Sequence, residues 1–244
     1  MKNLKLLFLG LIAMVVITGC DPNDDDGFFI CKDGEGAVVT RTVSLSTITG
    51  INLEIKANIF LSHGSSQQVT LEGQSNVLDE LEFTISNGVA KIDFDGCIDK
   101  YTTLNIYIRT PEIKQLTIQG EGEIKSESTL VIEDIDLTIN GTGNIELDLG
   151  AADDIDGTIK GSGKLRLEGS ADDLDVSISG SGDLKAFNLS AKKADLKITG
   201  SGDAEVNVEE TLKVNISGSG DVLYKGTPTV TQTISGTGEV LDAN

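Results

Sequence analysis

Residues 176–185 read VSISGSGDLK, and close variants of this stretch recur along the second half of the chain. Seven Gly-x-Gly triplets share its glycine pair, and their first glycines are 21, 20, 19, 20, 18 and 18 residues apart. The triplets begin at Gly120, Gly141, Gly161, Gly180, Gly200, Gly218 and Gly236. A fixed period of about twenty residues is typical of a solenoid, in which each repeat stacks on its neighbours.

Apolar and polar residues alternate on both sides of each triplet. Ile139 before one triplet and Ile145 after it share the parity of Gly141 and Gly143. Such alternation predicts strands with one buried face. We expect the glycines at corners, because inward side chains would collide there and glycine adopts unusual dihedral angles. The predicted corner residues are Gly141, Gly143, Gly161, Gly163, Gly180, Gly182, Gly200, Gly202, Gly218 and Gly220.

The pattern predicts an all-β protein in which residues 111–244 form a parallel β-helix with rungs of about twenty residues. Residues 31–110 alternate in the same way but lack the period. They predict a β-sandwich-like or irregular β region that covers the first rung and protects its edge. Asn87-Gly88 predicts a hairpin turn within this region. No amphipathic helix is predicted.

The composition excludes several classes of function. The 244 residues include 39 acidic and 19 basic side chains and one histidine. Nucleic-acid binding needs clustered cations, so the acidic balance excludes it. A single histidine excludes a multi-histidine metal centre. The sequence has no dinucleotide-binding, phosphate-binding or catalytic-serine motif, and we therefore expect neither a cofactor nor enzymatic activity.

The first nineteen residues predict an export signal. Lys2 and Lys5 precede an apolar run over residues 6–17, which is shorter than the roughly 20 residues that span a bilayer. Cys20 directly follows Gly19, in an arrangement that resembles the lipobox of bacterial lipoproteins. We expect Cys20 to be acylated and to anchor the protein in the outer membrane through its acyl chains. The alternative is an ordinary secretory signal with an incidental cysteine.

Residues 20–30 are rich in aspartate and predict a flexible tether. They resemble the acidic export signal of Bacteroidota surface lipoproteins, which implies exposure on the cell surface. A solvated spacer on a periplasm-facing lipoprotein is the alternative. Cys31 and Cys97 are the remaining cysteines, and outside the cytoplasm two thiols are expected to form a disulfide.

The chain resembles the GIN-domain family of Bacteroidota, whose members are described as auto-transporter adhesin head domains. The resemblance rests on the lipobox, the acidic tether, residues 31–36 (CKDGEG), residues 49–52 (TGIN), and residues 110–113 (TPEI) leading into the Gly-x-Gly repeats. It covers nearly all of the chain after the signal. It implies a right-handed β-helical fold, an extracytoplasmic location and adhesion, and it transfers no catalytic or binding residues.

We therefore predict a lipid-anchored cell-envelope protein that acts as an adhesin or surface-interaction module, with a glycan or protein as its ligand. The alternative is a polysaccharide-binding or polysaccharide-degrading β-helix protein. A lyase acting on acidic glycans needs cationic groups and a base, but Arg166 is the only arginine after Pro111. A glycosidase needs two carboxylates in distinct environments, and the many carboxylates here offer no evident pair.

In-register stacking would also align carboxylates in two columns. One column contains Asp136, Asp156, Asp175 and Asp195, and the other contains Asp183, Asp203, Asp221 and Glu239. Like charges one rung apart repel unless they are solvated or share a cation, and Ca²⁺ prefers oxygen ligands. We expect both columns to be solvated faces, and we retain a cation ladder of Asp183, Asp203 and Asp221 as the alternative.

Overall fold

The structure is a computed structural model that describes residues 31–244, which form one compact unit. The predicted export signal (1–19), the acylation site Cys20 and the tether (20–30) lie outside the described residues. Within the described part, no helix combines the length and the apolar character needed to cross a membrane.

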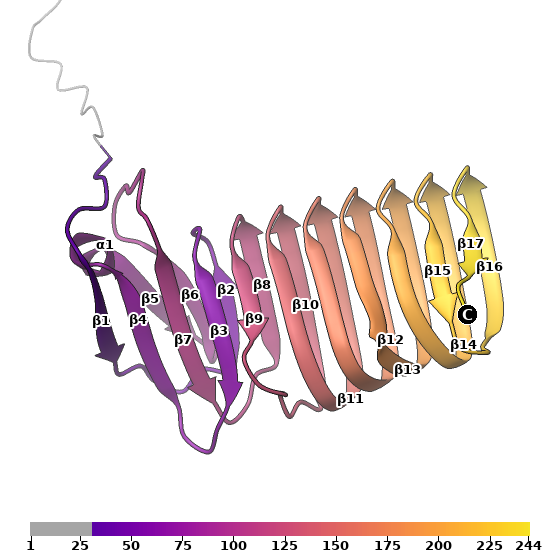
Figure 1. Ribbon diagram of the computed structural model, residues 1–244, viewed down its shortest axis with the longest axis horizontal. Helices are drawn as coiled ribbons and strands as arrows, with labels where there is room; N and C mark the ends of the chain where they lie inside the picture. Colours follow the sequence, from indigo (N-terminus) through magenta and orange to yellow (C-terminus); the bar gives the residue numbers. More distant parts are fainter. Residues whose placement is uncertain (1–30) are drawn as a thin grey trace, which may run out of the picture. The chain divides into compact units, whose positions relative to one another are not determined.

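Seventeen strands form one continuous sheet that winds into a β-solenoid of about six turns, which confirms the predicted fold class (Figure 1). The strands that end at the corner glycines, together with those aligned with them, form one broad side, which we call flank A. It comprises β2 (Gly50–Leu53), β6 (Val89–Phe94), β8 (Gln115–Gly120), β10 (Asp134–Gly141), the second halves of β11 (Asn144–Gly161), β12 (Lys164–Gly180), β13 (Asp183–Gly200) and β14 (Ala204–Gly218), and β16 (Thr229–Gly236).

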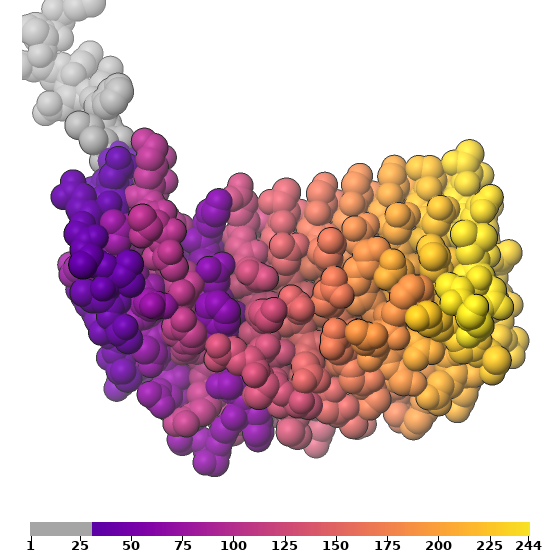
Figure 2. Space-filling view, in the orientation of Figure 1, coloured from indigo at the N-terminus to yellow at the C-terminus, as the bar shows by residue number. Residues whose placement is uncertain are grey.

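The opposite side, flank B, is formed by the strands that follow the corners. It comprises β3 (Asn58–His63), β7 (Leu104–Thr110), β9 (Glu123–Ser126), the first halves of β11 to β14, β15 (Val222–Lys225) and β17 (Val240–Asp242). From β8 to β16 the sequence colours follow one another along the column in Figure 2, because these rungs stack in chain order; in the N-terminal region β3 instead lies between β7 and β9.

Strand register keeps equivalent residues on top of one another. Ile159 aligns with Ile139 on one side and Ile178 on the other, and the same inward position continues to Ile198 and Ile216. All five side chains are at most 2% exposed. Burying an aliphatic side chain of this size contributes roughly 1.5–3 kcal/mol. The period-two pattern therefore supplies a continuous aliphatic core between the flanks.

Flank A strands end at the first glycine of each pair, and the predicted corner glycines lie along one edge of the column, where the arrows end at the top of Figure 1. Gly200 has φ +131°, and a Cβ built there would lie 2.2 Å from the Gly180 carbonyl oxygen. A Cβ on Gly202 would lie 2.1 Å from the Gly182 oxygen. The corners therefore stack backbone on backbone, and the nearest obstacle at these two glycines is the preceding rung's main chain.

The N-terminal region continues both flanks. β2 pairs with β8 and β3 pairs with β9, so hydrogen bonds connect the strands on the two sides of the predicted boundary at residue 110. Beyond them β4 (Gln68–Gln74) runs antiparallel to β7 and to β1 (Val38–Val43), and β5 (Leu81–Ser86) runs antiparallel to β6. The turn between β5 and β6 lies at Asn87-Gly88, where both residues have positive φ. One hydrophobic cluster extends from this region through the column.

A short helix, α1 (Ser75–Asp79), follows β4, whereas the sequence analysis predicted no helix. Its five residues are too few for a helical period to show in the sequence. Val77 and Leu78 are buried, so packing against the first layer of the core stabilises the turn.

Cys31 and Cys97 form the predicted disulfide, which links positions 66 residues apart. The amide of Lys32 donates to the Cys97 carbonyl at 2.8 Å, and the amide of Asp99 donates to the Lys32 carbonyl at 2.9 Å. The segment that enters the fold is thereby fixed to the end of the column opposite β16.

Candidate interaction surface

Outward carboxylates crowd flank A. The predicted column of Asp136, Asp156, Asp175 and Asp195 is in register. Asp134, Asp154 and Asp173 form a second row beside it. Burial, followed by the neighbouring carboxylates, raises the pKa of Asp154 and Asp175 above its usual range. On the later rungs Lys193 pairs with Asp173 and Lys213 pairs with Asp195, so the acidic character of flank A is strongest on its earlier rungs.

We expect Asp175→Asn to raise the melting temperature at pH 7. An aspartate whose pKa is raised in the folded state contributes stability below its unfolded pKa, about 3.9, and loses that contribution as the pH rises through the folded value. The gain from Asn should therefore vanish below about pH 3.9 and shrink at high salt. Thermal melts between pH 3.5 and 7 test this, with Asp95→Asn as a control that removes one charge far from the column. Equal gains for both variants would contradict a local cause.

The second predicted column of carboxylates lies just after the corners, and its side chains accept hydrogen bonds from backbone amides. The Asp203 carboxylate accepts a hydrogen bond from the Asp221 amide at 2.9 Å, and the Asp221 carboxylate accepts one from the Glu239 amide at 2.8 Å. Asp183 accepts a longer bond from the Asp203 amide, at 3.4 Å. Within residues 31–244, no group of three or more His, Cys, Asp or Glu side chains is arranged to hold a metal ion. Each carboxylate therefore fastens the next rung.

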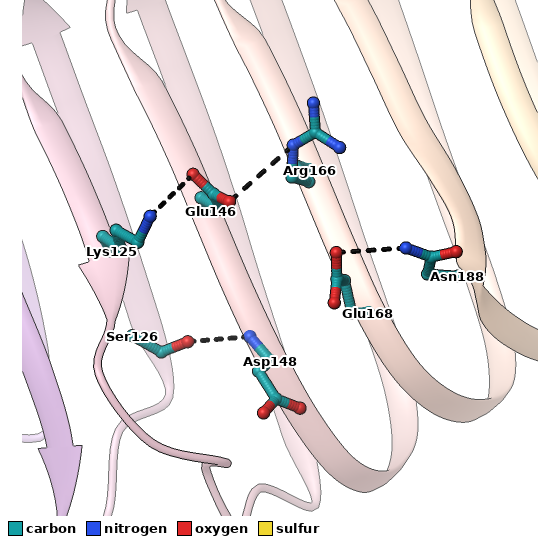
Figure 3. Close-up of polar contacts among 7 residues, drawn as sticks. All are labelled: Lys125, Ser126, Glu146, Asp148, Arg166, Glu168 and Asn188. Atoms are coloured by element: carbon teal, nitrogen blue, oxygen red, sulfur yellow. Dashed lines mark hydrogen bonds and ion pairs between the residues drawn. The ribbon is translucent and has the colours of Figure 1, made fainter.

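Flank B carries a ladder of paired charges across its outer face (Figure 3). Glu146 lies between two cations, with Lys125 Nζ at 3.4 Å from one carboxylate oxygen and Arg166 Nε at 3.8 Å from the other. Side-chain exposures of 38–45% leave all three groups in contact with solvent. Each exposed pair contributes at most about 1 kcal/mol, so the ladder contributes little to stability.

Hydrogen bonds between rungs hold the neighbouring side chains of flank B in place. Asn188 Nδ2 donates to Glu168 at 3.1 Å, and the Asp148 amide donates to Ser126 Oγ at 2.8 Å (Figure 3). On the next rungs Lys185 pairs with Glu205 at 2.9 Å. The outer face is therefore a regular array of donors and acceptors on a rigid scaffold.

Phe187 breaks this regularity. The register of β13 shifts against β12 between Arg166 and Glu168, and against β14 between Ala186 and Ser190. Phe187 follows the buried Leu184 and Ala186 in the alternation of β13, so its ring lies on the outer face, where Lys225 Nζ lies 4.4 Å from its centroid. A shallow recess of about 240 Å³ surrounds it, which we call the Phe187 recess. It is lined by Arg166, Leu167, Glu168, Lys185, Phe187, Asn188, Glu205 and Lys225.

Sequence reasoning selected no residue of this recess as a site. The available signal was an aromatic residue at an outward position among rungs that contain few aromatics. That signal is weak, because only the stacking of the rungs shows that the ring lies beside three cations.

A larger recess of about 560 Å³ lies near the disulfide, between Ile55, Phe94, Ile98 and Tyr101 among others. The Tyr101 hydroxyl donates to the Lys56 carbonyl at 2.6 Å, and the edge of Phe94 meets the Tyr101 ring at 5.6 Å. Burial and the Glu121 carboxylate raise the pKa of Tyr101, so the hydroxyl stays protonated. Its donor is already used within the protein. The Phe187 recess is the better candidate because it combines an outward aromatic ring with three cationic side chains.

The family model described as "Putative auto-transporter adhesin, head GIN domain" matches residues 48–228, most of the described unit. This chain belongs to that family. The resemblance noted in the sequence is thereby confirmed. The matched range includes most of both flanks and the Phe187 recess, and it leaves out β1 and the last rung.

Solved structures share the fold of this GIN-domain protein. A putative adhesin from Bacteroides fragilis superposes with a TM-score of 0.79 at 21% identity, covering 86% of this chain and 99% of that one. A putative adhesin from Parabacteroides distasonis gives a TM-score of 0.69 at 24% identity over 86% and 99% of the two chains. A putative lipid binding protein from the same species gives 0.71 at 24% identity over 88% and 100%. Comparison with curated proteins finds no match.

Proposed function

We propose that this GIN-domain protein is a lipid-anchored protein of the outer cell surface that acts as a non-catalytic, adhesin-like binding module. Flank B is its ligand-binding face and the Phe187 recess is the centre of that face. The observation that carries the proposal is the placement of four cations and an outward aromatic ring on flank B of a protein with a net charge of −20, while the column of Asp136, Asp156, Asp175 and Asp195 lies on the other flank.

The chemistry of flank B favours an acidic polysaccharide. Arg166 Nε is 3.8 Å from Glu146, a long contact that leaves the terminal guanidinium groups able to donate to a carboxylate or sulfate. Lys225 adds a second cation beside Phe187. The Phe187 ring provides an apolar surface against which a sugar ring packs. Since the carboxylates of flank A repel the same ligand, the protein would bind a polyanion through one flank only.

Three observations support a binding role over catalysis. The carboxylates that line the recess are engaged: Glu168 accepts from Asn188 and Glu205 pairs with Lys185. The family and its structural neighbours are described as adhesins. The rungs also hold the face rigid, which suits recognition of a repetitive polymer. Turnover of a bound polysaccharide, detected as reducing ends or unsaturated products, would overturn this assignment.

Binding should depend on Arg166 and Phe187. We expect Arg166→Gln and Phe187→Ala each to weaken binding of a sulfated or uronate-containing glycan about tenfold, because each removes about 1.4 kcal/mol of contact energy. The measurement is a glycan array followed by calorimetric titration of the best probe. Arg109→Gln, which removes an arginine hydrogen-bonded to Gln68 at the other end of the column, is the control. Unchanged affinity in both test variants would contradict the proposed site.

The anchor has a separate test. Cells that express the full chain should incorporate labelled palmitate into the protein, and Cys20→Ala should abolish that label. An impermeant antibody against flank B should stain intact cells. Labelled protein that stains only after permeabilisation would support the anchor and contradict the surface location.

A further inference from the structure

The flank A segment of the last rung differs from those of the other rungs in its charge. Residues 226–238 contain no charged side chain, although charged residues make up 24% of the chain. β16 pairs with β14 along one edge, and within residues 31–244 no strand pairs with its other edge. Ile234 on β16 and Leu241 on β17 of the same rung are 37% and 42% exposed.

The unpaired edge of β16 has a defined set of hydrogen-bonding groups. The Asp136 side chain on β10 points outward, and the Asp136 amide donates to the Lys114 carbonyl on the preceding rung. The Thr237 amide, just after β16, likewise donates to the Gly218 carbonyl on the preceding rung. Alternate residues of a strand direct their backbone groups to opposite sides. Val230, Gln232 and Ile234 therefore direct their N–H and C=O groups away from β14, towards the open end of the column.

Natural sheets protect such an edge with lysine, proline, a bulge or an inward charge. β16 reads TVTQTIS over residues 229–235, with β-branched residues at five of seven positions and none of these devices. A segment of this kind is a template for pairing with another strand.

The segment is also nearly identical when read backwards, as SITQTVT. Antiparallel pairing with a second copy about a two-fold axis at Gln232 places Val230 opposite Ile234, Thr231 opposite Thr233, and Gln232 opposite Gln232 of the second copy. The two apolar pairs join the two aliphatic cores. The outward-directed backbone groups of Val230, Gln232 and Ile234 all gain partners. A polar pair at the centre disfavours shifted registers.

We propose that the last rung is a homodimer interface in which β16 pairs antiparallel with β16 of a second copy, so that two columns join end to end. β1, the first strand of the fold, lies at the end of the column opposite β16 (Figure 1), and the pairing therefore places the two N-terminal entry points at the two far ends of the joined column. With the lipid anchor of the proposed function on each copy, the dimer would bridge two membranes through identical molecules. Only this consequence rests on the proposed function.

Sedimentation equilibrium of residues 21–244, which contain the whole described unit, tests the association. We expect the mean mass to rise towards twice the monomer mass with concentration. Gln232→Lys places two like charges at the two-fold axis and should weaken association at least tenfold. Gln232 is exposed, so the variant should melt at the temperature of the wild-type monomer. Thr199→Lys, an exposed position on an inner rung, is the matched control and should dimerise normally.

Cysteine cross-linking tests the register. Thr231 faces Thr233 of the second copy in a non-hydrogen-bonded pair, where Cα atoms lie about 4.5 Å apart and a disulfide can form. A mixture of Thr231→Cys and Thr233→Cys proteins should cross-link under mild oxidation many times faster than either variant alone. A wild-type protein that stays monomeric, dimers that Gln232→Lys does not weaken, or equal cross-linking in the single-variant samples would each overturn the proposal.

Glycan binding separates this proposal from the proposed function. The Phe187 recess lies on an inner rung, so monomeric Gln232→Lys should bind the glycan probe with unchanged intrinsic affinity. Loss of the dimer with retained glycan binding is expected of this variant, whereas a dimeric wild type without glycan binding would overturn only the proposed function.

Discussion

Gly200→Ala is expected to lower the free energy of unfolding by about 4 kcal/mol, roughly half from an L-residue held at positive φ and half from overpacking. Gly200 has φ +131°, and the new Cβ would lie 2.2 Å from the Gly180 carbonyl oxygen. That oxygen cannot move away, because it accepts the Ser201 amide at 2.8 Å. Urea denaturation followed by circular dichroism measures the change.

Two further glycines separate the causes. Gly120 has φ +96° with no atom within 4 Å of a built Cβ, so Gly120→Ala should cost only about 1–2 kcal/mol of backbone strain. Gly150 has ordinary φ, and its nearest neighbour would be the Leu130 oxygen at 3.5 Å. Gly150→Ala should therefore change stability by less than about 0.5 kcal/mol. Equal effects at all three positions would contradict backbone stacking as the reason for glycine at the corners.

Removing the disulfide is expected to cost about 4 kcal/mol. The Cys31–Cys97 link spans 66 residues, and loop-closure entropy for a loop of that size gives this figure on the chain-entropy model. The double variant Cys31→Ser/Cys97→Ser leaves no free thiol and isolates the effect of the link. Urea denaturation of both proteins gives the difference in unfolding free energy.

Reductant supplies the internal control, because it should destabilise the wild type to the level of the double variant and leave the double variant unchanged. A loss below about 1 kcal/mol would show that the segment around Lys32 detaches without loosening the column. In that case the link would close a local loop and would not constrain global unfolding.

The repeat could be predicted from the sequence because its causes are local. A positive-φ corner such as Gly161 accepts only glycine without strain, and alternation around Ile159 follows from the two faces of a strand. The pairing of Cys31 with Cys97 was also predictable, since no other pair remains after Cys20 is assigned to the anchor. The helix at Val77 was not, because one turn has no period and is stabilised by packing.

The register of the carboxylate columns was predicted correctly, but the role of the second column was not. Sequence spacing shows that Asp203 and Asp221 align; it does not show that a carboxylate reaches the amide of the next rung. The Phe187 recess has a similar origin. It depends on Arg166, Lys185 and Lys225, which come from different rungs.

The sequence by itself determined the all-β class, the rung length, the inward-facing positions and the corners, because each depends on dihedral preference and on hydrophobic period within a few residues. Only the tertiary structure decided which side chains share a face. Neighbours such as Lys125, Glu146 and Arg166 are about twenty residues apart in sequence but adjacent in space. Their contacts depend on strand register and bulges, which the packing of the whole column sets.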